Sequence, residues 1–130
     1  MKKKKRFKAV HEVGRTKRSD EILRPIESLK GKTEKALPKL APGTWQRKML
    51  EENAKALRIA AALLAGEDFE TGSCPREDRH AVRRALAAMI DKTEKAMVKF
   101  EPGTPHNTLQ RNRLKSLRLA KKAFGARFGT

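Results

Sequence analysis

Apolar residues recur with helical spacing in two segments of the chain that lie sixty positions apart. Within each segment they fall three or four positions from one another, which places them on one face of an α-helix. The sequence therefore predicts two helices with equivalent apolar faces. The faces consist of Ile22, Ile26, Leu29, Thr33, Ala36, Leu37 and Leu40 in the first helix, and of Val82, Leu86, Met89, Thr93, Ala96, Met97 and Phe100 in the second.

Each predicted helix ends at a Pro-Gly-Thr stretch, at residues 42–44 and again at 102–104. Proline and glycine interrupt a helix, and the threonine that follows them can cap the next helix with its hydroxyl group. Second helices are therefore predicted over about residues 44–65 and 104–125. Because the connection is so short, each pair of helices must form an antiparallel hairpin.

The start of the first helix in each pair differs between the two segments. Pro25 interrupts the first copy and indicates either a late start or a kink. Its counterpart is Ala85, so the equivalent helix is predicted to run unbroken from near Pro75, a residue favoured in a first turn.

Thirteen positions between residues 31 and 65 are identical to the residue sixty positions later, without a gap. This match indicates an internal duplication, with repeat 1 over about residues 19–66 and repeat 2 over about 75–126. Two hairpins that each have one apolar face must cover each other, which favours an all-α four-helix bundle with a pseudo-two-fold axis. Residues 16–130 are interpreted as this single domain, and residues 1–15 as a flexible basic arm that is disordered in the free protein.

The charge of the chain points to its partners. The 130 residues carry a formal net charge of +17 at pH 7, and 36% of them are charged. Such an excess favours polyanions, which here means nucleic acid, anionic lipid or an acidic protein. The excess is concentrated in residues 1–10, with six basic and no acidic residues, and in residues 71–130, with fourteen basic and five acidic residues.

The best candidate site is a row of cations on the last predicted helix. The row lies at i, i+4, i+7 and i+11 on one face, and the equivalent row of the first repeat is nearly neutral. A solubilising face usually mixes charges, because opposite charges at i,i+4 support a helix. Phosphate binding is therefore favoured over a plain solvated face. This basic stripe consists of Arg111, Lys115, Arg118 and Lys122, opposite the apolar Leu109, Leu114, Leu117, Ala120, Ala123 and Phe124; its equivalents are Glu51, Lys55, Arg58 and Ala62.

Further cations are candidates of weaker standing. The solvent side of the first helix in each repeat carries a basic cluster, read either as a solvated face or as a polyanion contact. The N-terminal arm is typical of segments that contact nucleic-acid backbones by counterion release, and also of solubilising or targeting tails. The clusters are Arg24, Lys32, Lys35 and Lys39, and Arg84, Lys92, Lys95 and Lys99; the cations of the arm include Lys2, Lys3, Lys4, Lys5 and Arg6.

Single residues carry three more expectations. Trp45 is predicted to be partly buried, with stacking on a base as the alternative. Arg113 lies near the middle of an apolar arc and is expected to snorkel to solvent or to pair with Glu94 or Glu101. Asp91 and Glu94 are expected to pair with Lys95 and Arg113.

Other function classes find little support. No phosphate loop or hydrolase motif occurs, the three histidines do not stand at ligand spacing, and Cys74 is the single cysteine. No catalytic residue, metal or cofactor is therefore predicted, nor a membrane span, and the cytoplasm is the expected location. The stretch His80–Asp91 resembles helices of basic helical domains that bind inorganic polyphosphate, but over twelve residues only, and no residue role follows from it.

The sequence thus predicts a small non-enzymatic protein that binds nucleic acid through the phosphate backbone, with little readout of sequence. DNA and RNA are not distinguished, although few aromatic residues are available for stacking on single strands. The alternative is a protein-interaction module, an inhibitor or adaptor that docks on an acidic protein surface.

Overall fold

The computed structural model describes residues 17–67 and 74–129, with side chains from residue 20 onward. This part of the chain is all-helical, with four α-helices, one short 3-10 turn and no strand. The predicted arm, residues 1–15, lies outside the described residues. The elements are α2 (Lys17–Ala36), η1 (Leu37–Lys39), α3 (Trp45–Leu64), α4 (Arg76–Met97) and α5 (Pro105–Phe128).

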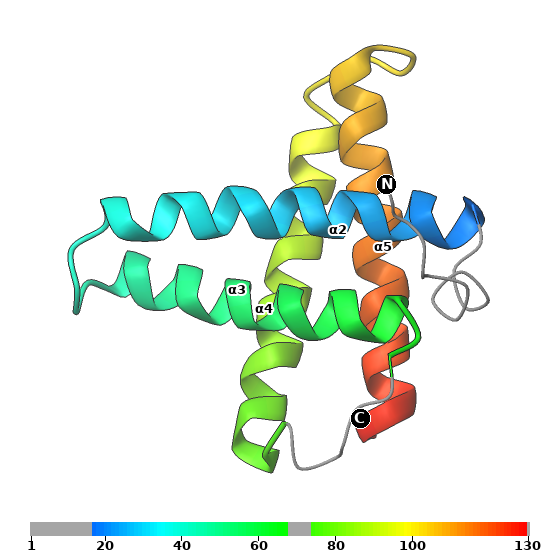
Figure 1. Cartoon of the computed structure of the whole chain (residues 1–130). Coiled ribbons are helices and arrows are strands. Elements are labelled where there is room, and N and C mark those ends of the chain that lie inside the picture. Colours follow the sequence, from blue (N-terminus) through cyan, green and yellow to red (C-terminus); the bar gives the residue numbers. More distant parts are fainter. Residues whose placement is uncertain (1–16, 68–73, 130) are drawn as a thin grey trace, which may run out of the picture.

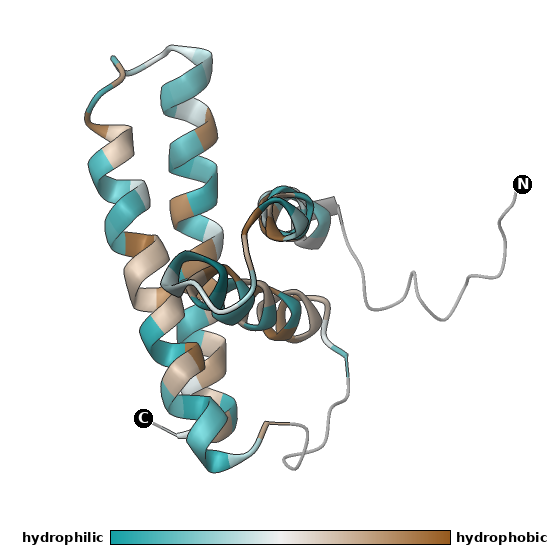
Figure 2. Cartoon of the chain, turned by 90° about the vertical axis from the view of Figure 1, so that its left-hand side faces the viewer, coloured by the Kyte–Doolittle hydropathy of each residue, from teal (hydrophilic) through white to brown (hydrophobic). Residues whose placement is uncertain are grey.

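The helices form two antiparallel hairpins that lie across each other (Figure 1). Helices α2 and α3 run side by side, and α4 and α5 form a second pair that crosses behind them. Figure 2 shows the first hairpin nearly end-on against the side of the second, with hydrophilic and apolar segments alternating along the helices. Helix α3 packs against both α4 and α5, whereas α2 packs against α5. The bundle is thus built from crossed hairpins rather than from four aligned helices.

Both hairpin turns use the predicted threonine caps. The hydroxyl of Thr44 accepts a hydrogen bond from the backbone N–H of Arg47 at 3.3 Å, and that of Thr104 accepts one from Asn107 N–H at 3.2 Å. The preceding glycines, Gly43 and Gly103, have φ values of 85° and 89°, which a side chain would strain. The Pro-Gly-Thr stretches therefore act as helix stop and helix start, as predicted.

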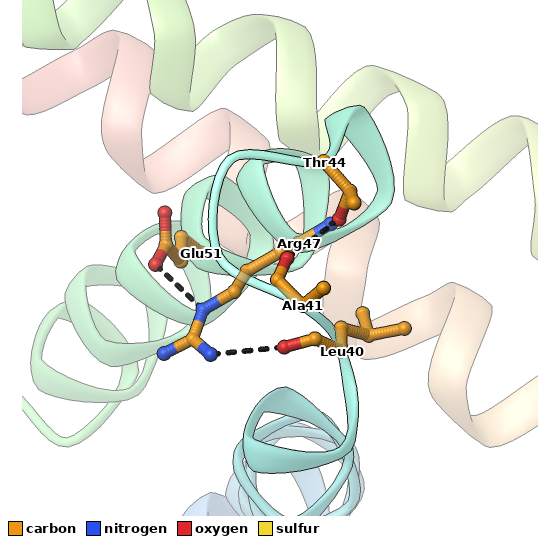
Figure 3. A network of polar contacts seen from close by, with 5 residues as sticks. All are labelled: Leu40, Ala41, Thr44, Arg47 and Glu51. Carbon is orange, nitrogen blue, oxygen red and sulfur yellow. Dashed lines mark hydrogen bonds and ion pairs between the residues drawn. The ribbon is translucent and has the colours of Figure 1, made fainter.

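The first turn is held further by Arg47 (Figure 3). Its guanidinium group donates to the carbonyl oxygen of Leu40 at 3.0 Å and to the carboxylate of Glu51 at 3.2 Å. In the second turn Asn107 takes this position, and its amide donates to the carbonyl oxygens of Met97 and Phe100 at 3.2 and 3.0 Å. The same structural task is done by a cation in one hairpin and by a neutral amide in the other.

The core lies where the hairpins cross. Leu57 on α3 and Leu117 on α5 are both fully buried, as their central positions on the two apolar faces predict. Alanines beside them, Ala60 and Ala120, are also buried and let the helix backbones approach closely. Thr33 and Thr93 are buried as well, and each hydroxyl donates to a carbonyl oxygen one turn earlier in its own helix. Small residues thus allow a thin core to be closely packed.

The structure decides or corrects expectations at three residues. Pro25 lies inside α2, which begins at Lys17, so of the two predicted outcomes the late start is excluded. Trp45 is 69% exposed rather than partly buried, because it begins α3 at the outer end of the hairpin. Leu109, placed on the apolar side of the last helix, is 41% exposed and lies near the start of α5. No helix of the described part is long and apolar enough to cross a membrane.

Candidate nucleic-acid interface

The basic stripe lies on the outer face of α5. Arg111, Lys115, Arg118 and Lys122 are all exposed, and Leu114, Leu117 and Ala120 between them are buried on the inner face. The guanidinium group of Arg111 donates to the amide oxygen of Asn107 at 2.8 Å, which orients the side chain, and no carboxylate of the described residues pairs with it. The fold therefore presents the four cations to solvent along one helix.

The predicted cations of α4 do not form one group with this stripe. Lys95 pairs with Asp91 at 3.0 Å, as expected, and Lys99 is exposed near the second turn. Lys92 lines a cavity between the two hairpins, described below. The remaining predicted cations, Lys2, Lys3, Lys4, Lys5 and Arg6, lie outside the described residues.

Equivalent ion pairs show how the two halves differ in charge. Arg47 and Glu51 form an i,i+4 pair on α3 at 3.2 Å. Sixty positions later the residues are Asn107 and Arg111, so the acid is replaced by a base and the base by a neutral amide. The local geometry is similar in the two pairs, because Arg47 is hydrogen-bonded to Glu51 and Arg111 is hydrogen-bonded to Asn107. The pair on α3 is neutral overall, whereas the corresponding pair on α5 carries a net positive charge.

The same change occurs where the hairpins cross. At the contact between α3 and α4, Lys55 pairs with Asp78 at 2.6 Å, and Arg84 lies 3.9 Å from the carboxylate of Glu52. At the equivalent contact between α2 and α5, the cations are Lys115 and Arg24. The positions of the two acids are occupied in the sequence by Arg18 and Asn112. Cations therefore stand at the corresponding positions of both contacts, whereas the acids occur at the contact between α3 and α4 only.

A hollow of about 690 Å³ lies at this contact between α2 and α5. Its lining includes Arg24, Lys115 and the amide side chain of Asn112, together with one carboxylate, Glu21. No ion pair of Lys115 or Arg24 occurs among the described residues. The buried Ser116 holds the two helices together here by donating to the carbonyl oxygen of Ile22 at 2.6 Å. Arg24 and Lys115 thus border a recess beside the basic stripe without an ion-pair partner among the described residues.

One ion pair occurs at corresponding positions in both hairpins. Arg58 on α3 pairs with Glu34 on α2 at 3.6 Å, and Arg118 on α5 pairs with Glu94 on α4. Within each hairpin these pairs join neighbouring helices, and all four side chains are about half exposed. Arg118 is accordingly the one member of the basic stripe with a carboxylate partner among the described residues.

A second cavity, of about 340 Å³, lies between the two hairpins and is lined by all four α-helices. We call it the axial cavity. Its lining consists of six pairs of positions that are sixty residues apart. Leu29 and Met89, Lys32 and Lys92, and Thr33 and Thr93 are three of these pairs. Each half therefore meets its own equivalent residues at this place.

Arg113 lines the axial cavity and does not form the predicted ion pair. Glu94 is engaged by Arg118 instead, and no partner of Arg113 occurs among the described residues. Its Nε atom is buried without a hydrogen bond, and burial lowers the pKa of the guanidinium group from its ordinary value. The reason is geometric: residue 113 lies two positions from Arg111 and Lys115, which turns it to the opposite side of α5.

Comparisons with known proteins add nothing to this geometry: no family model, curated protein or solved structure matches the chain.

The sequence did not predict the surroundings of two basic residues, Arg24 and Arg113. Arg24 was grouped with the lysines of its own helix, because helical periodicity relates residues within one helix only. Its position beside Lys115 depends on how α2 crosses α5. A signal was nevertheless available in the offset of sixty: comparing each acid with its counterpart would have shown Glu51, Glu52 and Asp78 replaced by Arg111, Asn112 and Arg18.

Proposed function

We propose that this protein binds nucleic acid through the phosphate backbone, with the outer face of α5 and its contact with α2 as the binding surface. One observation carries the proposal. At three equivalent positions the acids that neutralise cations around α3, namely Glu51, Glu52 and Asp78, have a basic or neutral residue as counterpart around α5. Helix α5 itself contains seven basic and no acidic residues.

The dimensions of the basic stripe suit a nucleic-acid strand. Arg111 and Lys122 are eleven positions apart, which corresponds to about 16 Å along an α-helix. One strand of a duplex presents a phosphate about every 3.4 Å, so the stripe can span about four or five of them. Backbone contacts of this kind release counterions and read little sequence. The proposed role is binding without catalysis, on DNA or on RNA.

We further propose that the two halves arose by an internal duplication and are related by a pseudo-two-fold axis. The support lies in contacts that recur sixty positions apart, which are the two threonine caps, the two buried threonines and the pairs Arg58–Glu34 and Arg118–Glu94. The paired lining of the axial cavity adds to it, since residues near a two-fold axis meet their own equivalents. The binding surface is then a difference acquired on a shared fold.

The experiment exchanges the outer faces of α3 and α5. Replacing Arg111→Glu and Lys122→Ala gives α5 the residues of the first repeat at both positions. Each lost contact lowers the slope of log K against log salt by about 0.9 on duplex DNA, and we expect binding to weaken by about tenfold or more. The melting temperature should change little, because both positions are exposed. Fluorescence anisotropy with labelled duplex DNA and with an RNA hairpin at several salt concentrations measures the affinity and the slope.

The matched control is the reverse exchange, Glu51→Arg with Ala62→Lys, which should strengthen binding. It removes the partner of Arg47, a loss of a few tenths of a kcal/mol at an exposed i,i+4 pair. If the wild type and the α5 variant bind both nucleic acids equally, or neither binds, the proposal is wrong.

The alternative, docking on an acidic protein, has an observation of its own. Trp45 and Met49, one turn apart on α3, are 69% and 40% exposed at the end of the first hairpin. Exposed aromatic and methionine side chains are typical of protein-interaction surfaces. Purification with and without nuclease separates the two functions. A 260/280 absorbance ratio that nuclease lowers supports nucleic acid, and an acidic protein that remains bound after nuclease treatment supports the alternative.

A further inference from the structure

The axial cavity has a composition that the duplicated fold does not require. Its walls combine apolar side chains, among them Leu29 and Met89, with the cations Lys32, Lys92 and Arg113. No acidic residue of the described part of the chain belongs to its lining. Lys55 and Arg58 elsewhere in this molecule pair with carboxylates, whereas the described lining of the axial cavity offers its cations none.

At two of the six pairs of positions that line the cavity, the residue of the second repeat is more polar than that of the first. Asn53 of the first repeat corresponds to Arg113 of the second, and Leu50 corresponds to Gln110. The second repeat thus adds a guanidinium group and an amide to a cavity whose other pairs match in character. Both additions are hydrogen-bond donors.

Arg113 is the central residue of the argument. Five N–H groups make a guanidinium group a strong donor, and a buried donor without a partner is costly. Its Nε has no partner among the described residues, and neither Glu94 nor Glu101 is paired with it. An oxyanion in the cavity would supply the missing acceptor and at the same time the missing counter-charge.

We propose that the axial cavity binds a small organic anion, a molecule with one carboxylate or phosphate group on an apolar body. Arg113 binds the oxyanion, Lys32 and Lys92 close over it from two different helices, and the apolar body packs on Leu29 and Met89. The hydroxyls of Thr33 and Thr93 already donate to backbone carbonyls, so they contribute methyl surface and acceptor oxygens rather than donors. The volume of about 340 Å³ lies at the small end of ligand cavities.

The experiment uses phenyl phosphate as the probe on the full chain, with benzyl alcohol as its neutral counterpart. The readout is the methyl signal of Met89 in the NMR spectrum, because Met89 is buried and lines the cavity. Phenyl phosphate should shift this signal in a saturable way, and benzyl alcohol at the same concentration should shift it far less.

The chain itself offers the matched variant, Arg113→Asn, since asparagine is the residue at the equivalent position 53. We expect it to fold and to bind phenyl phosphate about tenfold or more weakly, a loss that corresponds to one charge-assisted contact. Arg113→Lys keeps the charge and should retain part of the affinity. Unchanged binding to Arg113→Asn, equal binding of benzyl alcohol, or a Met89 signal that does not move would each overturn the proposal.

Nucleic-acid binding is tested separately in the same variants. Arg113→Asn should bind duplex DNA like the wild type, and the variant with Arg111→Glu and Lys122→Ala should bind phenyl phosphate like the wild type. If Arg113→Asn also weakens DNA binding, and DNA displaces phenyl phosphate, the cavity belongs to the nucleic-acid surface. The proposal of a separate small-molecule site would then be wrong.

Discussion

Helices α3 and α5 occupy equivalent places in the two hairpins, and they are alike in the core where the hairpins cross and unlike on their outer faces. On their inner faces the equivalent leucines and alanines at positions 57 and 117 and at 60 and 120 are fully buried. On the outer faces, α3 has a carboxylate partner for every cation except Lys48 among the described residues, whereas α5 has one for Arg118 only.

This difference teaches how a surface can change while a fold is kept. The inner residues are constrained by packing at the crossing point, where a single methylene group affects stability. The outer pairs are exposed salt bridges, and these contribute about 1 kcal/mol or less each. Replacing an acid such as Glu51 or Glu52 therefore alters charge at little cost in folding. Surface charge can therefore differ between the two hairpins at little cost in stability.

The largest expected effect tests whether the inner faces are equivalent. Leu57→Ala and Leu117→Ala should each destabilise the protein by about 2–5 kcal/mol, because each removes a fully buried side chain and leaves a cavity. Urea denaturation followed by circular dichroism measures both. A loss below about 0.5 kcal/mol at either position would contradict the assignment of the core.

A smaller effect tests the contact between α2 and α5. Ser116→Ala removes the buried hydrogen bond to the carbonyl oxygen of Ile22, and the residue at the equivalent position 56 is already alanine. We expect a loss of about 0.5–1.5 kcal/mol in the free energy of unfolding. Nucleic-acid affinity at protein concentrations and temperatures where the variant is folded should be unchanged, because Ser116 is buried. If Ser116→Ala leaves the free energy of unfolding unchanged, this contact does not hold the hairpins together.

The smallest effect in stability gives the sharpest comparison. Lys55→Ala breaks the pair with Asp78 and should destabilise the protein by about 0.2–1 kcal/mol, without a change in nucleic-acid binding. Lys115→Ala breaks no ion pair among the residues that the structure describes, so stability should hold while the salt slope of binding falls by about 0.9. Thermal melts measure the change in stability of each variant, and salt titrations measure the change in the slope of binding for each. If both variants lose stability and neither loses binding, the equivalent lysines have the same role and the comparison fails.

The sequence by itself determined the local structure of this protein. Helical periodicity and Pro-Gly-Thr signals depend on neighbouring residues, so they predicted the four helices, both threonine caps, the buried Leu57 and Leu117 and the i,i+4 pair of Asp91 with Lys95. They also predicted that the four cations of the basic stripe share one face of a helix, and the structure leaves these side chains exposed.

The tertiary structure alone decided which helices meet and at what positions. Lys55 pairs with Asp78 across 23 positions and Arg118 with Glu94 across 24, whereas sequence reasoning assigned Glu94 to Arg113. Contacts between helices depend on how the hairpins cross and on their relative register, and no periodicity within one helix contains that information. For the same physical reason, the recess at Arg24 and Lys115 and the axial cavity around Arg113 emerge only once the two hairpins lie across each other.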